Sequence, residues 1–466
     1  MPLPNTTADA TNGAAAADMR RIAVIGAGYV GLTAAACLAL LGHRVVCADT
    51  DVGKVDRLRG GRVDIHEPLL ANLVTAGLST GLLSFAVGIT DAIAAVGRVD
   101  VVLVCVPTPS SPDGSLDLST LRAVIIELGT TLAPGRVISV NSTVPAHEFP
   151  CLESWLGRHD LGLVSNPEFL RKGRAVEDFL RPDRIVVGAR DSAAAHQVAE
   201  LYARLDAPIL FTDPVSAALI KNVANGYLAM RLSYVNAISQ LCDRVGGNTL
   251  DVVNGMGYDQ RIGRAYLRPG PGWGGPSLPK DTSALLHMSD DLDFEFPLLR
   301  ATIETNDRQT AHVLAKIRLA ATGTPTGVLT EVRVGMLGLA FKPGTDDLHC
   351  SPALRIATEL ARAGARVVGQ DPAVRIPAAV DNELCSVVED PYQVARNAHV
   401  VAVVTDWPEF AVLDWSRIAT LMTGRAVVDA CDSLDPKIVV AAGLDYLCMG
   451  RGSTMRPELP ASGGVR

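Results

Sequence analysis

The sequence predicts an α/β protein made of two doubly wound parallel sheets that a long central helix joins. Near both ends of the chain, short β-branched runs alternate with helical stretches, as in parallel sheets whose strands are joined by helices. An uninterrupted helical pattern lies between them over residues 216–244. The 466 residues are 48% hydrophobic and 20% charged, which is enough core material for roughly two to four domains.

Composition argues against several classes of partner. A net charge of -8 and a pI near 5.6 leave no basic stripe for nucleic acid. No run of about 18 apolar residues is free of charges, so no membrane span is expected. Nine cysteines lie scattered without CxxC spacing, which predicts reduced, mostly buried thiols and no metal site. Residues 1–18 lack a basic start before an apolar stretch and predict a disordered tail on a cytoplasmic protein.

The first element is a strand over 21–25, which runs into Gly26-Ala27-Gly28-Tyr29-Val30-Gly31 and a helix over 32–41. A second strand, 44–48, ends at Asp49. Strand, three glycines, helix, strand and acidic residue form the dinucleotide fingerprint of a Rossmann-like domain.

Each fingerprint residue has an expected role. Gly26 makes the turn, Gly28 admits the pyrophosphate, and Gly31 lets the helix pack closely on the strand. Asp49 would accept hydrogen bonds from ribose hydroxyls and repel a 2′-phosphate, which favours NAD over NADP. FAD shares the fingerprint, and Asp49 does not exclude it.

Two further strands, 99–106 and 136–140, run into loops that contain Thr108 and Thr143. Ligands bind beyond the carboxyl ends of such strands, so both threonines are candidate cofactor contacts. Hydroxyls at these places also serve as turn or helix-capping groups, and that alternative stays open. A strand over 161–165 brings Glu168 to the same edge.

The long helix carries Lys221 and Asn225 four positions apart and therefore on one face. Polar side chains on an otherwise apolar helix more often have a function than merely face solvent. Apolar residues on more than one side of this helix predict a dimer interface.

The run from Arg268 to Asp281 is so rich in Gly and Pro that it must be a loop. Such loops let the backbone approach a ligand, although interdomain linkers have the same composition. We expect a helix from Asp281 to about residue 289 and a longer one over 297–321.

A second α/β unit follows a linker. Strands are expected at 332–337, 366–370, 400–404 and 426–428, with a helix over 353–362. Lys342 beside Gly344 would suit a phosphate. The predicted organisation is a disordered tail (1–19), an NAD-binding domain (20–212), a central helical domain (213–321), a linker (322–331), a second Rossmann-like domain (332–452) and a second disordered tail (453–466).

These motifs resemble the UDP-glucose/GDP-mannose dehydrogenase family, and above all its UDP-glucose 6-dehydrogenase members. The resemblance runs nearly throughout residues 21–451 and includes Ser142-Thr143-Val144-Pro145, Asn166-Pro167-Glu168-Phe169-Leu170, Pro279-Lys280-Asp281 and Phe341-Lys342-Pro343-Gly344-Thr345. It implies NAD as cofactor, a nucleotide-sugar substrate, a homodimer and two successive oxidations at C6 through a cysteine-bound thioester.

The resemblance also implies residue roles. Lys221 and Asn225 would stabilise the developing oxyanion, and Asp281 would order or deprotonate a water. Glu168 would assist proton transfer or thioester hydrolysis. The expected substrate contacts are Phe169, Leu170, Lys221, Asn225, Trp273, Gly274, Phe341 and Lys342.

The sequence departs from the family pattern at three places, one of them a pair of residues. Ser277 stands where the family has its nucleophilic cysteine, and no histidine lies in this loop to activate a hydroxyl. Lys172 replaces a glutamate, and His349-Cys350 replaces an Arg-Glu pair. The last change puts the contacts to the cofactor or substrate phosphates in doubt.

We therefore expect an NAD-dependent enzyme that oxidises a hydroxyl of a nucleotide-linked sugar and stops at the carbonyl. Three alternatives remain. They are full four-electron oxidation of UDP-glucose to UDP-glucuronate, oxidation of a secondary alcohol to a ketone, and a non-catalytic homologue that binds nucleotide and NAD.

Overall fold

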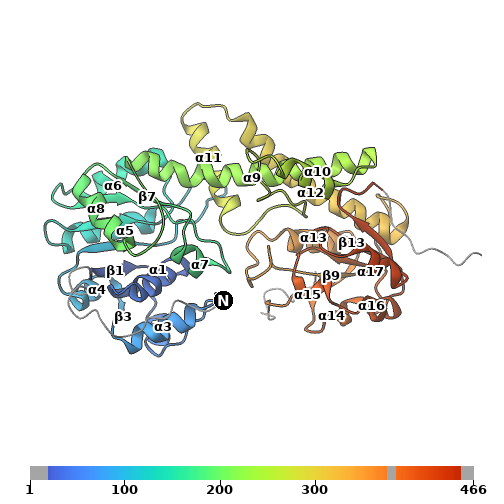
Figure 1. The fold of residues 1–466 in the computed structure, drawn as a ribbon, viewed down its shortest axis with the longest axis horizontal. Helices are drawn as coiled ribbons and strands as arrows, with labels where there is room; N and C mark the ends of the chain where they lie inside the picture. Colours follow the sequence, from blue (N-terminus) through green and yellow to red (C-terminus); the bar gives the residue numbers. More distant parts are fainter. Residues whose placement is uncertain (1–18, 375–384, 453–466) are drawn as a thin grey trace, which may run out of the picture. The chain divides into compact units, whose positions relative to one another are not determined.

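The computed structural model describes residues 19–374 and 385–452 and divides into two compact units, Met1–Val223 and Ala224–Arg466. Each unit is a layered α/β structure (Figure 1). Apart from Met19, the predicted disordered tails lie outside the described residues.

The first unit contains an eight-stranded sheet in the order β3-β2-β1-β4-β5-β6-β7-β8. Its first six strands are parallel, as predicted, in the order typical of dinucleotide-binding domains. Strand β7, which the sequence analysis did not predict, pairs with β6 in the antiparallel direction and is the exception to the predicted parallel sheet. The strands are β1 (Arg21–Ile25), β2 (Arg44–Asp49), β3 (Leu83–Val87), β4 (Val101–Val104), β5 (Val137–Val140), β6 (Gly162–Ser165), β7 (Ile185–Ala189) and β8 (Ile209–Thr212).

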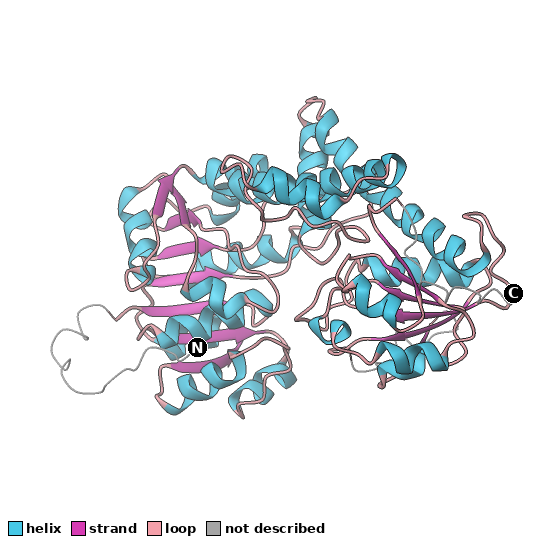
Figure 2. Ribbon diagram, turned by 45° about the vertical axis from the view of Figure 1, so that its right-hand side comes forward, coloured by secondary structure: helices cyan, strands magenta, loops and turns pink. Residues whose placement is uncertain are grey.

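Helices cover both faces of this sheet (Figure 2). Ile22 and Val24 of β1 belong to one buried core, whereas Ala23 and Ile25 belong to the other, as the alternation of side chains along a strand requires. The helices are α1 (Tyr29–Leu40), α2 (Val52–Arg59), α3 (Leu70–Ser79), α4 (Gly88–Val96), α5 (Ser119–Thr131), α6 (Phe149–Leu156), α7 (Ala175–Leu180) and α8 (Ser192–Ala199).

The long helix is α9 (Pro214–Val245), with 32 residues. It begins two residues before the predicted start, because proline is well tolerated at the first helical position. It ends before Gly246, whose φ is 76°.

The second unit contains a six-stranded, fully parallel sheet in the order β11-β10-β9-β12-β13-β14. Val334 and Met336 of β9 face one core, and Leu337 belongs to the other. The strands are β9 (Arg333–Leu337), β10 (Arg366–Gln370), β11 (Ser386–Val387), β12 (Val400–Val403), β13 (Ala426–Asp429) and β14 (Asp445–Cys448). The two doubly wound sheets confirm the predicted fold class.

The remaining helices of this unit are α10 (Thr249–Gly257), α11 (Leu278–Asp291), α12 (Pro297–Thr322), α13 (Pro352–Arg362), α14 (Pro391–Ala395), α15 (Pro408–Ala411), α16 (Trp415–Leu421) and α17 (Pro436–Ala441). Helix α11 begins three residues earlier than expected. Asp281 therefore lies inside its first turn, where a carboxylate is favoured by the helix dipole.

Candidate active site

The glycine-rich turn between β1 and α1 fits a dinucleotide. Gly26 has a φ of +102°, and a Cβ there would lie 2.6 Å from the carbonyl oxygen of Cys105. A Cβ on Gly31 would lie 1.8 Å from the carbonyl oxygen of Gly26, so the helix can approach the turn only with glycine there. A Cβ on Gly28 would meet nothing within 4 Å. Open space therefore lies at the start of α1, where helix amides favour a phosphate.

Asp49 lies at the end of β2, beside this turn. Its Oδ2 accepts hydrogen bonds from the amide of Ala27 at 3.1 Å and from Lys54 Nζ at 2.9 Å. Burial alone would raise the pKa of Asp49, but the hydrogen bonds from Lys54 and the backbone amides outweigh it and leave the pKa below its ordinary value. Asp49 is thus a carboxylate that can accept from ribose hydroxyls. Sequence analysis did not identify Lys54, although a basic residue shortly after the acidic one was a visible signal.

The two candidate threonines differ in exposure. Thr108 is buried and Thr143 is half-buried. The neighbouring Ser142 has a structural function, because its Oγ donates to the carbonyl oxygen of Val106 at 2.7 Å and so fixes the loop after β5 to the end of β4. The roles of Thr108 and Thr143 in cofactor binding stay predictions.

Glu168 and Lys221 come together although 53 residues separate them. Lys221 Nζ forms an ion pair with the Glu168 carboxylate and donates to the Glu168 carbonyl oxygen at 2.7 Å. The other carboxylate oxygen of Glu168 accepts from the amide of Leu170 at 2.6 Å. Lys221 is only 6% exposed, so its charge requires this partner.

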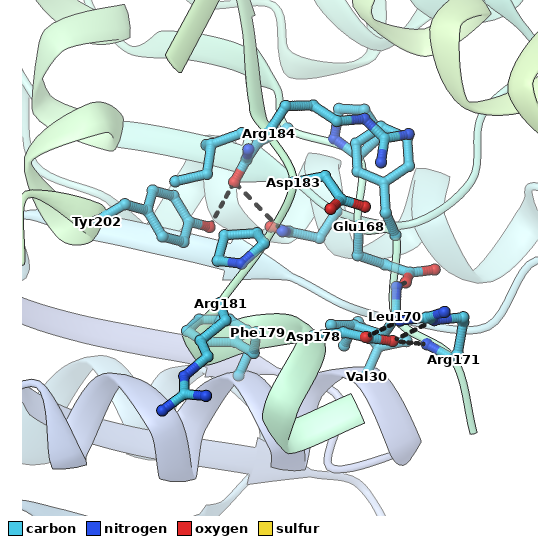
Figure 3. Close-up of a pocket in the computed structure, with 17 residues that line it drawn as sticks. Val30, Glu168, Leu170, Arg171, Asp178, Phe179, Arg181, Asp183, Arg184 and Tyr202 are labelled. Carbon is cyan, nitrogen blue, oxygen red and sulfur yellow. Dashed lines mark hydrogen bonds and ion pairs between the residues drawn. The ribbon is translucent and has the colours of Figure 1, made fainter. Parts of the chain in front are cut away.

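A cavity of about 100 Å³ lies beside Glu168, between the loop that follows β6 and the segment before β7 (Figure 3). The guanidinium of Arg184 lies 3.6 Å from the centre of the Phe169 ring, and burial lowers the pKa of this arginine. The guanidinium of Arg171, in the loop after β6, donates to the carboxylate of Asp178 in α7 at 2.6 Å (Figure 3). Two of the predicted substrate contacts, Phe169 and Leu170, therefore line this cavity.

In the second unit, Asp281 is fully buried and both its oxygens are occupied. Asn225 Nδ2 donates to Oδ2 at 2.5 Å, and Lys280 Nζ donates to Oδ1 at 2.7 Å. Ser277 precedes the first residue of α11 and is half-buried, and its side chain makes no helix-capping hydrogen bond. A serine hydroxyl and a paired carboxylate thus lie one helical turn apart along the chain.

The Gly- and Pro-rich loop before Ser277 is ordered by polar side chains from two helices. The amide of Trp273 donates to Asn306 Oδ1 at 2.7 Å, and its indole Nε1 donates to Ser233 Oγ at 2.9 Å. Asn236 Oδ1 accepts from the amide of Gly270 at 2.9 Å, and Gln309 Nε2 donates to the carbonyl oxygen of Gly270 at 2.7 Å. The loop is thus a fixed element of the unit. Sequence analysis missed these anchors; Ser233 and Asn236 are polar residues three apart on a largely apolar stretch of α9, whereas Asn306 and Gln309 lie in a polar run of α12 and give no such signal.

The same loop packs against the segment that follows β9. A Cβ on Gly274 would lie 2.0 Å from the carbonyl oxygen of Cys350, and a Cβ on Gly275 would lie 2.5 Å from the Phe341 ring. The amide of Gly275 donates to the carbonyl oxygen of His349 at 3.1 Å. The structure thereby brings Phe341 and His349 to the loop two residues before Ser277.

His349 contacts the glycine-rich loop through its backbone carbonyl oxygen. Its Nδ1 lies 2.6 Å from Oδ1 of the buried Asp347, while the side chain is 76% exposed. Lys342 Nζ lies 5.9 Å from the centre of the Phe341 ring on the same segment. Sequence proximity could not reveal that this segment contacts the loop, because about 70 residues separate the two.

The nine cysteines are all free, and seven are buried, as predicted; Cys151 is intermediate and Cys350 is exposed. Over residues 19–374 and 385–452, no group of three or more His, Cys, Asp or Glu side chains is arranged to hold a metal. Within the same ranges, no helix has the length and apolar character needed to span a membrane.

Comparison with known proteins gives consistent matches along the chain. Three domain models of the UDP-glucose/GDP-mannose dehydrogenase family match: the NAD-binding domain at residues 20–206, the central domain at 215–308 and the UDP-binding domain at 335–436. A UDP-glucose 6-dehydrogenase of Rhizobium meliloti is 39% identical over 92% of this chain and 99% of its own. The UDP-glucose 6-dehydrogenase TuaD of Bacillus subtilis is 37% identical over 94% of this chain and 95% of its own. The solved structure of a UDP-glucose dehydrogenase from Pyrobaculum islandicum has a TM-score of 0.83 and 35% identity over 93% of this chain and 98% of that one.

Proposed function

The chain belongs to the UDP-glucose/GDP-mannose dehydrogenase family, and from that premise we propose that it performs one oxidation per substrate and releases a carbonyl product. It is an NAD-dependent oxidoreductase that acts on CH–OH groups of nucleotide sugars. The number of oxidations per substrate is the part that this proposal adds.

The single observation that carries the proposal is Ser277. The resemblance implies a cysteine at this position, and a thiolate is accessible near neutral pH whereas a serine alkoxide is not. Without a thioester, the second oxidation must proceed through a hydrated aldehyde, which is a slower route.

The first oxidation does not need a thiol. NAD, when bound, accepts the hydride. The alcohol would lose its proton to a water that Asp281 orders or deprotonates, and the positive charge of Lys221 and the amide of Asn225 would stabilise the alkoxide. The proposed set is therefore complete for converting an alcohol to a carbonyl.

The test is the number of NADH formed per nucleotide sugar consumed, together with the product mass, over a panel of nucleotide sugars and free nucleotides. One NADH and a product two mass units lighter supports the proposal. Two NADH and a sugar acid at the full turnover rate refutes it. NAD binding without turnover on any substrate would favour a non-catalytic homologue.

A second candidate is full oxidation of UDP-glucose, which the names of the relatives favour. Their 37–39% identity makes UDP-glucose the first substrate to test. Oxidation of a secondary alcohol to a ketone is the third candidate, because a ketone cannot be oxidised further and needs no thiol. Product mass alone does not separate an aldehyde from a ketone, so trapping with hydroxylamine and NMR of the adduct would be required.

We also propose that the protein works as a homodimer through α9. Three large apolar side chains remain exposed at intervals of seven residues on this helix, with exposed fractions of 53% for Tyr227, 52% for Tyr234 and 52% for Leu241. A stripe with this spacing is typical of helix pairing. Sedimentation velocity should give a dimer for the native chain and a monomer for Tyr234→Asp, whereas a native monomer at micromolar concentration would refute the proposal.

A further inference from the structure

We propose that Glu67 is a positioning residue that couples the cofactor turn to the loop carrying Glu168. Glu67 precedes α3, is only 7% exposed, and belongs to none of the predicted catalytic or binding groups. Its carboxylate receives hydrogen bonds from two segments that lie more than 100 residues apart in the sequence. The inference requires only that the chain binds NAD, and it does not depend on how many oxidations follow.

One end of the connection is the start of α7. The amide of Gly173 donates to Glu67 Oε2 at 2.7 Å, and the amide of Ala175 donates to Oε1 at 2.7 Å. Ala175 is the first residue of α7, and the residue before it supplies no side-chain cap. Glu67 therefore caps this helix from a distant segment, which a carboxylate at a helix N-terminus does well.

Helix α7 in turn fixes the loop that carries Glu168. Asp178 accepts from the guanidinium of Arg171 at 2.6 Å and from its backbone amide at 2.9 Å (Figure 3). Residues 171–178 thus form one hydrogen-bonded unit directly after Glu168. Movement of α7 would displace the backbone that holds this glutamate.

The other end of the connection is Tyr29, the first residue of α1, next to Gly28. The Tyr29 hydroxyl donates to Glu67 Oε2 and accepts from the amide of Gly173 at 3.0 Å. Burial and then the hydrogen bond to Glu67 raise the pKa of Tyr29, so its hydroxyl stays a donor. Lys172 Nζ lies 5.3 Å from the centre of the Tyr29 ring and adds a second contact between turn and loop.

A ligand on the turn therefore acts on the loop through the Tyr29 hydroxyl and the Glu67 carboxylate that it contacts. If a pyrophosphate at Gly28 restrains α1, Tyr29 is restrained, and Glu67 transmits this to Gly173 and Ala175. A purely structural Glu67 would instead give a loop whose order does not respond to ligands on the turn.

Hydrogen–deuterium exchange with ADP-ribose as the probe separates these two cases. ADP-ribose carries the pyrophosphate but no nicotinamide, so it tests the effect of occupying the turn alone. In the native protein, saturating ADP-ribose should slow exchange of residues 166–180. Tyr29→Phe, which leaves Glu67 bonded to both loop amides, should bind ADP-ribose and lose this slowing.

Glu67→Gln replaces one acceptor oxygen with an NH2 group, which cannot accept the hydrogen bonds that Tyr29, Gly173 and Ala175 donate. Residues 166–180 of this variant should therefore exchange fast with or without the probe. In steady-state assays, both variants should raise the KM of the nucleotide sugar about tenfold at saturating NAD, as expected for the loss of a hydrogen bond to a charged group. The matched controls are the exposed Tyr258→Phe and Glu127→Gln, which should behave like the native protein.

Retention of the slowing in Tyr29→Phe, or its absence in the native protein at saturating ADP-ribose, would overturn the proposal. If Glu67→Gln fails to fold, Tyr29→Phe still decides. One or two NADH per substrate has no bearing on this outcome, so the two proposals fail independently.

Discussion

Asn225 donates to Asp281 at 2.5 Å, and the carboxylate of Asp281 is fully buried. A buried carboxylate needs all of its partners, since an unpaired one costs several kcal/mol. Lys280 supplies the second partner at 2.7 Å. The resemblance assigns the Asn225 amide to oxyanion stabilisation, and the structure shows that the same amide also orients Asp281, the candidate base.

We expect Asp281→Asn to lower kcat by about 10² to 10⁴, the range for loss of a general base. Asn225→Ala should lower it by about 10² to 10³, and the double variant should lose less than the product of both, because the two side chains act as a unit. The measurement is kcat for the four proteins of the cycle, with the exposed Asn254→Ala as control. If the fold-loss in kcat of the double variant equals the product of the two single losses, the contact between Asn225 and Asp281 does not contribute to catalysis.

We expect Ser277→Cys to add a second oxidation. A thiol at this position would trap the aldehyde as a thiohemiacetal, so NADH per sugar should rise from one toward two and an acid should appear. The exposed Ser84→Cys is the control for adventitious thiol chemistry and should leave the ratio unchanged. An unchanged ratio in both variants would mean that residue 277 does not lie at the reacting carbon.

Asp49→Asn should weaken NAD binding about tenfold, because the amide is a poorer partner for ribose hydroxyls than a carboxylate. The same change removes the charge that repels a 2′-phosphate and leaves Lys54 without its carboxylate partner. The preference for NAD over NADP should therefore narrow. Competition titrations with both cofactors measure it, and an unchanged ratio would refute the assigned role.

The contact of Asp243 with α12 predicts a pH dependence of stability. Lys316 Nζ lies 2.9 Å and His312 Nε2 3.1 Å from Oδ2 of this carboxylate. Burial alone would raise the pKa of Asp243, but these bonds outweigh it and the pKa falls below its ordinary value. A depressed folded pKa gives stability that is present above the unfolded value of about 3.9 and is lost as pH falls through the folded pKa.

The destabilisation caused by Asp243→Asn should consequently be large near pH 5 and shrink below about pH 4. Urea unfolding of the native and variant proteins across this range measures the difference. Asp206→Asn, at an exposed site, provides the baseline. A difference that stays constant down to about pH 2 would contradict the assigned linkage.

His349→Arg should lower the KM of a phosphate-bearing ligand roughly three- to tenfold. The side chain is 76% exposed, so arginine fits without disturbing a core, and its permanent charge can pair with a phosphate in a bidentate manner. Steady-state titration of NAD and of the nucleotide sugar identifies which ligand responds. No change in either KM would show that this position does not contact phosphate.

Much of the fold was predictable because it depends on local pattern. The strand at Arg21–Ile25, the glycine turn and the strand at Arg366–Gln370 were placed to the residue, since β-branched runs and closely spaced glycines are local signals. The direction of β7 and the early start of α11 at Leu278 were not, because they depend on pairing and packing.

Within the candidate site, the sequence by itself determined the chemistry available: the fingerprint glycines, Asp49, Glu168, Lys221, Asn225, Asp281 and a serine at position 277. Only the tertiary structure decided which groups meet. It pairs Lys221 with Glu168, orders the glycine-rich loop through Asn306 and Gln309, brings His349 to Gly275, and connects Glu67 to both Tyr29 and Ala175. Contacts between residues so far apart in the chain leave no periodic trace in the sequence, because they arise only when separate helices and strands pack and must satisfy their buried polar groups together.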